Sequence, residues 1–254
     1  MSQGRPPAAL QKLRETLRVL ERAEGFRAKP GQAVLPFGVS ALDNLWPEGG
    51  LPRGALHEVA GESPAPGSFA AATGFAAAIA GRTVATVLWC ARGRDLYGPG
   101  LSAVGLDARR LIIAEARSDK DILSAMEEGL RHGALGAVIG EVERMDLTAS
   151  RRLQLAAEKT GTLTLVLRRP GKRAQENAPI TAASRWRVGT VGETGPQDFH
   201  QMPARARWRL ELTRSRCGAH GSWIVEAPDA QGHLHLSAAV ADRSLGTPYT
   251  KRVA

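Results

Sequence analysis

Cysteine is nearly absent from this chain: Cys90 and Cys217 are the only two among its 254 residues. Two cysteines cannot form a disulfide framework, and no Cys/His spacing in the chain is typical of a metal site. The N-terminal segment has no long apolar region, and nowhere do about eighteen apolar residues run together. We therefore expect a soluble, cytoplasmic protein that is not exported and contains no structural metal.

The net charge of +9 is unevenly distributed along the chain. Residues 1–30 carry +4, residues 31–143 carry −4, residues 144–216 carry +9, and the remainder is neutral. A basic surface attracts the phosphate backbone of nucleic acids, and it equally suits an acidic protein partner. The charge alone leaves both kinds of partner open.

The N-terminal residues repeat leucine at helical spacing, and basic residues occupy the other faces of the expected helix. The repeated leucines are Leu10, Leu13, Leu17 and Leu20. Such a helix either packs on its own domain or docks on another subunit through these leucines. The segment behind it is rich in Gly and Pro, which favours an arm (1–25) joined by a linker (26–37) and used for partner binding.

Apolar strand-like runs then alternate with helical patterns up to about residue 169. The expected strands are 55–61, 83–91, 110–116, 134–143 and 162–169, and the expected helices are 68–81, 119–133 and 147–161. Strands separated by helices of this length predict crossover connections and therefore an α/β fold with a mostly parallel sheet. After residue 180, the strand-like segments 184–191, 206–216 and 221–228 are separated by turns and predict an antiparallel extension at one sheet edge. The core domain is expected over 38–227, with a C-terminal tail over 228–254.

The stretch VAGESPAPGSFA lies between an expected strand and an expected helix, where a phosphate-binding loop would lie. In the G-x-x-x-x-G-K-[ST] frame, Gly61 is followed after four residues by Pro66, Gly67 and Ser68, so the lysine is missing. Pro64 and Pro66 also remove two amide donors from the anion-binding loop. These changes predict a vestigial site that binds no nucleotide cofactor, with a residual anion pocket as the alternative.

The stretch FGVSALDNLWPEGGLPRGALHEVAGES resembles the approach to this loop in the RecA-like recombinase ATPases. The resemblance implies a RecA-like twisted sheet flanked by helices. Those ATPases have an acid that activates water after the second core strand, whereas Arg92 stands here and does not deprotonate. Glu141 matches the metal-holding strand, but we expect it to be a solvated carboxylate at a strand end. ATP hydrolysis is not expected.

Two further features of the recombinase pattern concern DNA. The long loop expected after Glu141 is missing, and the second DNA loop corresponds to residues 170–183, which include Lys172 and Arg173. Alternation along residues 206–216 puts Trp208 on a buried side and arginines on the opposite side. The candidate nucleic-acid surface therefore consists of Lys172, Arg173, Arg207, Arg209, Arg214 and Arg216.

The stretch WCARGRDLYGPGL and the compact region from LVLRRP to ARWRLELTRSRCG resemble the ImuA family of inducible-mutagenesis proteins. The resemblance implies a nucleoid-associated accessory protein of an SOS-induced translesion-synthesis complex. Its implied partners are ImuB, an inactive relative of Y-family polymerases, an error-prone C-family DNA polymerase, and RecA. Two alternatives remain: an atypical RecA-like ATPase, and a direct single-stranded DNA-binding protein. The sequence leaves the oligomeric state open.

Overall fold

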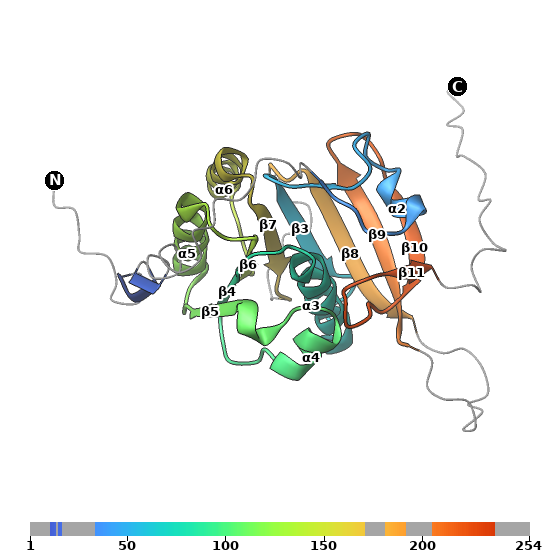
Figure 1. Ribbon diagram of the computed structural model, residues 1–254, viewed down its shortest axis with the longest axis horizontal. Coiled ribbons are helices and arrows are strands. Elements are labelled where there is room, and N and C mark those ends of the chain that lie inside the picture. Colours follow the sequence, from blue (N-terminus) through green and yellow to red (C-terminus); the bar gives the residue numbers. More distant parts are fainter. Residues whose placement is uncertain (1–10, 14, 17–33, 171–180, 192–204, 237–254) are drawn as a thin grey trace.

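The computed structural model describes residues 11–13, 15–16, 34–170, 181–191 and 205–236 (Figure 1). In this part of the chain, a nine-stranded sheet has the strand order β11-β10-β9-β8-β3-β7-β6-β4-β5. Its strands are β3 (Leu56–Gly61), β4 (Val87–Ala91), β5 (Leu111–Glu115), β6 (Ala137–Val142), β7 (Leu163–Arg168), β8 (Ser184–Val191), β9 (Arg207–Ser215), β10 (Gly221–Glu226) and β11 (His235–Leu236). The strands from β8 to β5 in this order are parallel, which confirms the predicted α/β fold.

The central strands β4, β6 and β7 are buried along their whole length, as expected for parallel strands covered on both faces. The helices are α2 (Ser40–Asp43), α3 (Pro66–Gly81), α4 (Gly98–Ala103), α5 (Asp119–His132) and α6 (Leu147–Thr160), with a 3-10 turn η1 (Ala108–Arg110). Helix α3 packs with one face of the sheet, and α5 and α6 pack with the other (Figure 1). None of the helices in the described ranges is long and apolar enough to cross a membrane.

Local signals fix where the two outer helices begin and end. The side chain of Ser118 accepts a hydrogen bond from the Asp121 amide at the start of α5, and Asp146 does the same at the start of α6. Each helix ends at a glycine with positive φ, Gly133 and Gly161. Helix α6 begins five residues after β6 ends, so the connection between them is short, as the sequence predicted.

Five aromatic residues gather on the α3 face of the sheet. Trp186 of β8 is fully buried, and its ring centroid lies 5.5 Å from that of Phe75 in α3 and 5.7 Å from that of Phe37. Trp46 and Trp223 complete the cluster at 6.0 and 6.4 Å from Trp186. This cluster joins α3 and the segment before β2 to the sheet extension.

The antiparallel extension is confirmed for β9, β10 and β11, but residues 184–191 were wrongly placed in it. Strand β8 pairs in parallel with β3, and the direction changes only between β8 and β9. Strands β3, β7 and β8 therefore begin at the same end of the sheet, and β9 begins at the opposite end. Along β9, Trp208 and Leu210 are buried while Arg209 is exposed, as the alternation predicted.

The packed region extends beyond residues 38–227 at both ends. Within the expected linker, β1 (Val34–Leu35) pairs with β2 (Leu51–Pro52), and Leu35 and Phe37 are buried. Within the expected tail, Leu234 is buried and β11 pairs with β10. The packed region therefore also includes residues of the expected linker and residues of the expected tail.

Candidate nucleotide-binding site

The loop that follows β3 leads directly into α3, at the sheet edge where β4, β6 and β7 also end (Figure 1). A Cβ atom on Gly61 would lie 3.1 Å from the Phe69 nitrogen and the Ser63 oxygen. Glycine is therefore needed for the close approach of the strand end to the start of the helix. Gly61, Pro66, Gly67 and Ser68 thus occupy the strand-loop-helix position that the sequence predicted.

The backbone of this loop has few amides left for an anion. The amides that already have a partner in the chain are those of Glu62, Ala65, Ser68 and Phe69. Pro64 and Pro66 have no N–H. Within residues 62–69, the amides of Ser63 and Gly67 are the ones left without a hydrogen bond in the described chain. The Ser68 hydroxyl is buried and lies 2.9 Å from the Ser63 hydroxyl, so it is also engaged.

Glu62 fastens the loop to the sheet extension. Its carboxylate accepts a hydrogen bond from Arg209 of β9 at 2.7 Å, and its carbonyl accepts one from Arg187 of β8 at 2.8 Å. Its amide donates to the carbonyl of Val188 at 2.8 Å. A Cβ atom on Gly189 would lie 1.8 Å from the Glu62 carboxylate. Glycine at that position leaves room for the Glu62 carboxylate, and these contacts tie the loop to β8 and β9.

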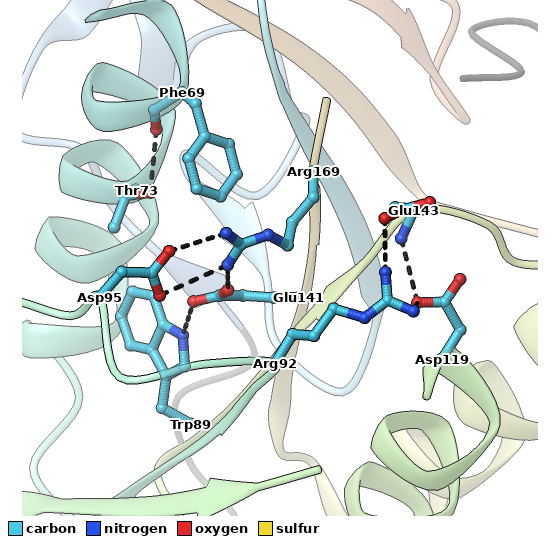
Figure 2. Close-up of polar contacts among 9 residues, drawn as sticks. All are labelled: Phe69, Thr73, Trp89, Arg92, Asp95, Asp119, Glu141, Glu143 and Arg169. Atoms are coloured by element: carbon cyan, nitrogen blue, oxygen red, sulfur yellow. Dashed lines mark hydrogen bonds and ion pairs between the residues drawn. The ribbon is translucent and has the colours of Figure 1, made fainter. Parts of the chain in front are cut away.

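Glu141 of β6 lies inside the protein, so the expectation of a solvated carboxylate was wrong. Its side chain is 1% exposed and accepts a hydrogen bond from the Trp89 indole at 2.8 Å. Its second oxygen forms an ion pair with Arg169 (Figure 2). Burial raises the pKa of Glu141, while the hydrogen bonds from Trp89 and Arg169 act in the opposite direction. The adjacent strands β4 and β7 supply the partners that make this burial tolerable.

Arg169 directly follows β7 and connects several elements of the site. Its guanidinium donates to the Asp95 carboxylate at 2.7 Å and lies 5.1 Å from the centre of the Phe69 ring (Figure 2). The hydrogen bond from Arg169 is the main cause that lowers the pKa of Asp95. Both carboxylate oxygens of Glu141 are therefore engaged, one by the Trp89 indole and the other by the Arg169 guanidinium.

Arg92 directly follows β4, where the recombinases have an acid. It contacts Glu143 at 2.5 Å and Asp119 at 3.6 Å (Figure 2). The Asp119 carboxylate also accepts the amides of Glu143 and Arg144. These contacts join the ends of β4 and β6 to the start of α5. Arg92 therefore has carboxylate partners within the protein. Because a guanidinium stays protonated, Arg92 cannot accept a proton from an attacking water.

The remaining predicted site residues are placed as follows. Leu13 is buried against its own domain, in the cluster that includes Ile122 and Met126 of α5. Arg209 pairs with Glu62, and Arg216 lies 3.7 Å from Glu158. Leu10, Leu17, Leu20, Lys172 and Arg173 lie outside the described residues. Arg207 is half-buried and Arg214 is exposed.

Three residues of the site were not predicted from the sequence: Trp89, Asp95 and Arg169. The available signal was the run RRP at the end of an expected strand, since parallel strands present their carboxyl ends at one sheet edge. An arginine at that edge is a natural partner for Glu141 once β6 and β7 are known to be adjacent. The spatial order of the strands cannot be read from the sequence, so the pair between Arg169 and Glu141 was not predicted.

Comparison with known proteins gives two findings, whereas no protein-family model matches the chain. The chain is 40% identical over 212 residues to Protein ImuA of Caulobacter vibrioides strain NA1000 / CB15N, covering 79% of this chain and 85% of that protein. The same protein from strain ATCC 19089 / CIP 103742 / CB 15 matches equally. Among solved structures, the RadB recombinase aligns with a TM-score of 0.52 at 16% identity, covering 80% of this chain and 99% of the other. This likeness shows that the fold is RecA-like.

Proposed function

This chain belongs to the ImuA family, and on that premise we propose that it acts without catalysis in bacterial inducible mutagenesis. In this proposal, it is a RecA-like pseudo-ATPase that binds partner proteins in an SOS-induced translesion-synthesis complex at the nucleoid. In support of this proposal, the fold is RecA-like, and Glu141, Ser68 and most amides of the loop after β3 have partners within the chain.

The observation that carries the proposal is the ion pair between Glu141 and Arg169 inside the candidate site. A nucleotide with magnesium needs a free carboxylate, a lysine and a set of loop amides. Here the carboxylate is paired, the lysine position is Gly67, and most loop amides have internal partners. Each lost charged hydrogen bond costs ~1.5–3 kcal/mol of binding free energy, so several together would remove useful affinity for nucleotide.

Calorimetric titration of the full chain with ATP and magnesium tests the pseudo-ATPase assignment. We expect no binding heat at millimolar ATP and no phosphate release above buffer. A measurable turnover that Glu141→Gln abolishes would establish the atypical ATPase instead. The Val84→Lys variant serves as a control for nonspecific attraction of phosphate, since Val84 is 77% exposed and lies away from the site.

The proposed partners are ImuB, an error-prone C-family polymerase and RecA, as the family membership suggests. Purified ImuB should form a complex with the full chain in size-exclusion chromatography without any nucleotide. If complex formation requires ATP, the chain is a nucleotide switch rather than a pseudo-ATPase. If none of the three partners binds, the accessory role is refuted.

Direct binding of single-stranded DNA is a weaker candidate on the described surface. Arg209 and Arg216, two of the predicted contacts, have carboxylate partners in the chain. Pairing reduces the charge available for phosphates and therefore the release of counterions. Fluorescence anisotropy with labelled single-stranded DNA at two salt concentrations tests this candidate, and a steep salt dependence would favour it.

A further inference from the structure

The outer side of α6 carries a short row of exposed side chains. Arg151, Leu155 and Lys159 follow one another at intervals of four residues, so they lie on one side of the helix; we call these three residues the α6 row. The opposite side of α6 contributes Leu153 and Ala157 to the core. Leu155 is 65% exposed, so the packing of this domain does not use its side chain.

The two cations of the α6 row have no counter-ion in the part of the chain that the structure describes. Arg151 and Lys159 are exposed, and the side chain of neither forms an ion pair or a hydrogen bond there. Arg152, by contrast, lies on the side of α6 that faces α5 and pairs with Glu127 of that helix. The α6 row therefore keeps its positive charge available for a partner.

Glu158, the acid beside the α6 row, is engaged by other side chains. It accepts a hydrogen bond from Gln154 at 2.7 Å and lies 3.7 Å from Arg216, which directly follows β9. This acid therefore does not act as a counter-ion for Arg151 or Lys159. An outside group with negative charge can pair with these two cations without displacing a partner within the protein.

The composition of the α6 row favours a protein segment over nucleic acid. Phosphates would pair with the cations but would leave Leu155 in water. Proteins that bind single strands also stack bases on aromatic side chains, and none of the three residues of the row is aromatic. A single exposed leucine is common on protein surfaces, but here an unpaired cation lies on each side of it. An acidic segment with one apolar side chain complements both features.

The spacing of the row sets the spacing of its complement. Because an α-helix rises about 1.5 Å per residue, Arg151 and Lys159 lie about 12 Å apart along the axis of α6. A short segment does not form a stable helix alone. An extended chain covers about 13 Å in four residue steps, and its alternate side chains point to the same side. An apolar residue with an acid two positions before it and another two positions after it therefore matches the row.

We propose that the α6 row binds an acidic, extended segment of a partner protein. The segment places an apolar side chain on Leu155 and a carboxylate beside each of Arg151 and Lys159. The inference deepens the proposed function, on which it rests, by naming the surface and the chemistry of the partner segment.

A displayed library of random ten-residue peptides, selected on the full chain, tests the α6 row without knowledge of the natural partner. We expect the recovered peptides to share an apolar residue with Asp or Glu two positions away on both sides. Measured by fluorescence anisotropy, they should bind Arg151→Glu/Lys159→Glu at least about tenfold more weakly, because two attractive charge pairs become repulsive. They should also bind Leu155→Ala more weakly, because the apolar contact is lost.

The Lys120→Glu/Arg205→Glu variant is the matched control. Both residues are exposed cations without an ion pair in the described ranges, and neither belongs to α6. The control makes the same change in net charge, so the recovered peptides should bind it about as tightly as the wild type. An equal loss of binding in the control would assign the effect to the overall charge of the protein and would overturn the proposal.

A second selection, on Arg151→Glu/Lys159→Glu, should recover peptides with Lys or Arg in place of the acids. Recovery of no peptides on the wild type, equal binding to the variants of the row, or an unchanged preference for acids would each contradict the proposal. A labelled oligothymidine tests the other occupant. If no peptide is recovered, and the double variant loses the oligothymidine while Leu155→Ala keeps it, the occupant is nucleic acid and the proposal is wrong.

Purified ImuB, the C-family polymerase and RecA separate this inference from the proposed function. At least one of them should bind the wild type and lose affinity for both variants of the row. If the partners bind these variants as tightly as the wild type, the α6 row fails as a site while the accessory role stands. If the selected peptides bind as expected but none of the three partners binds the wild type, the accessory role fails instead.

Discussion

Arg169 at the end of β7 pairs with the buried carboxylate of Glu141 in β6, and the same guanidinium reaches Asp95 in the segment after β4. One side chain thus ties together the ends of neighbouring parallel strands. The pair also occupies the interior of the candidate site. The stability of the protein therefore depends on this contact, and under the proposed function the absence of ATP hydrolysis depends on it as well.

Arg169→Ala should destabilise the protein by about 3–5 kcal/mol, because it leaves a buried carboxylate without its cation. Glu141→Gln should cost less, since an amide still accepts the Trp89 hydrogen bond and carries no charge. Urea unfolding followed by circular dichroism measures both changes. Equal costs for the two variants would show that the carboxylate is not charged in the folded state.

Rebuilding the loop pattern alone should not restore ATP hydrolysis. The Pro66→Gly/Gly67→Lys variant recreates the G-x-x-x-x-G-K-S pattern, but Arg92 and the paired Glu141 remain. We expect phosphate release to stay at the level of buffer, even if weak ATP binding appears in calorimetry. Turnover in this variant would mean that the loop, rather than the strand ends, limits the chemistry.

His57 should make the stability depend on pH between about 6.5 and 4. Burial lowers its pKa to about 4, the hydrogen bond to the Pro52 carbonyl partly opposes this, and the charge of Arg216 adds to the lowering. The unfolded chain therefore takes up a proton near pH 6.5 that the folded chain refuses. Stability should fall by roughly 3 kcal/mol as the pH drops through this window.

The check is urea unfolding at pH 7.0, 5.5 and 4.5 for the wild type and for His57→Asn. The variant is expected to be less stable at all three values, because it loses the contacts with Ser184 and Pro52. Its pH slope over this range should nevertheless be much smaller. An identical slope in both proteins would assign the effect to other groups.

Trp186→Ala should destabilise the protein by about 3–5 kcal/mol, as expected for a fully buried aromatic side chain. Trp186 contacts several aromatic rings and donates its indole N–H to Ser184 at 3.0 Å. Trp223→Ala, at the border of the same cluster, should cost clearly less because Trp223 is only half-buried. Chemical unfolding followed by circular dichroism gives both values.

The sequence predicted the helices and strands of the sheet well, because apolar runs and capping residues are local signals. Residues 184–191 were predicted as a strand with the observed bounds, but not with the observed direction. Direction depends on where the chain re-enters the sheet, which no local pattern records. The positions of Gly61 and Ser68 were predictable because the residues of a loop motif are consecutive in the sequence.

The adjacent arginines at the end of β7 show why the site itself was harder to predict. Arg168 lies 3.3 Å from Glu58 of β3, whereas Arg169 pairs with Glu141 of β6. The two side chains contact different acids for two reasons: consecutive residues of a strand point to opposite faces of the sheet, and β7 lies between β3 and β6. The order of the strands is a property of the folded sheet. The two residues of each pair lie far apart in the sequence, and charge alone does not show which acid each arginine contacts.

The two borders of the sheet differ in length. Strand β5 presents five residues at one border, whereas β11 presents two exposed residues at the other. Within the described chain, the border at β5 is therefore the longer stretch of backbone with a strand on one side only.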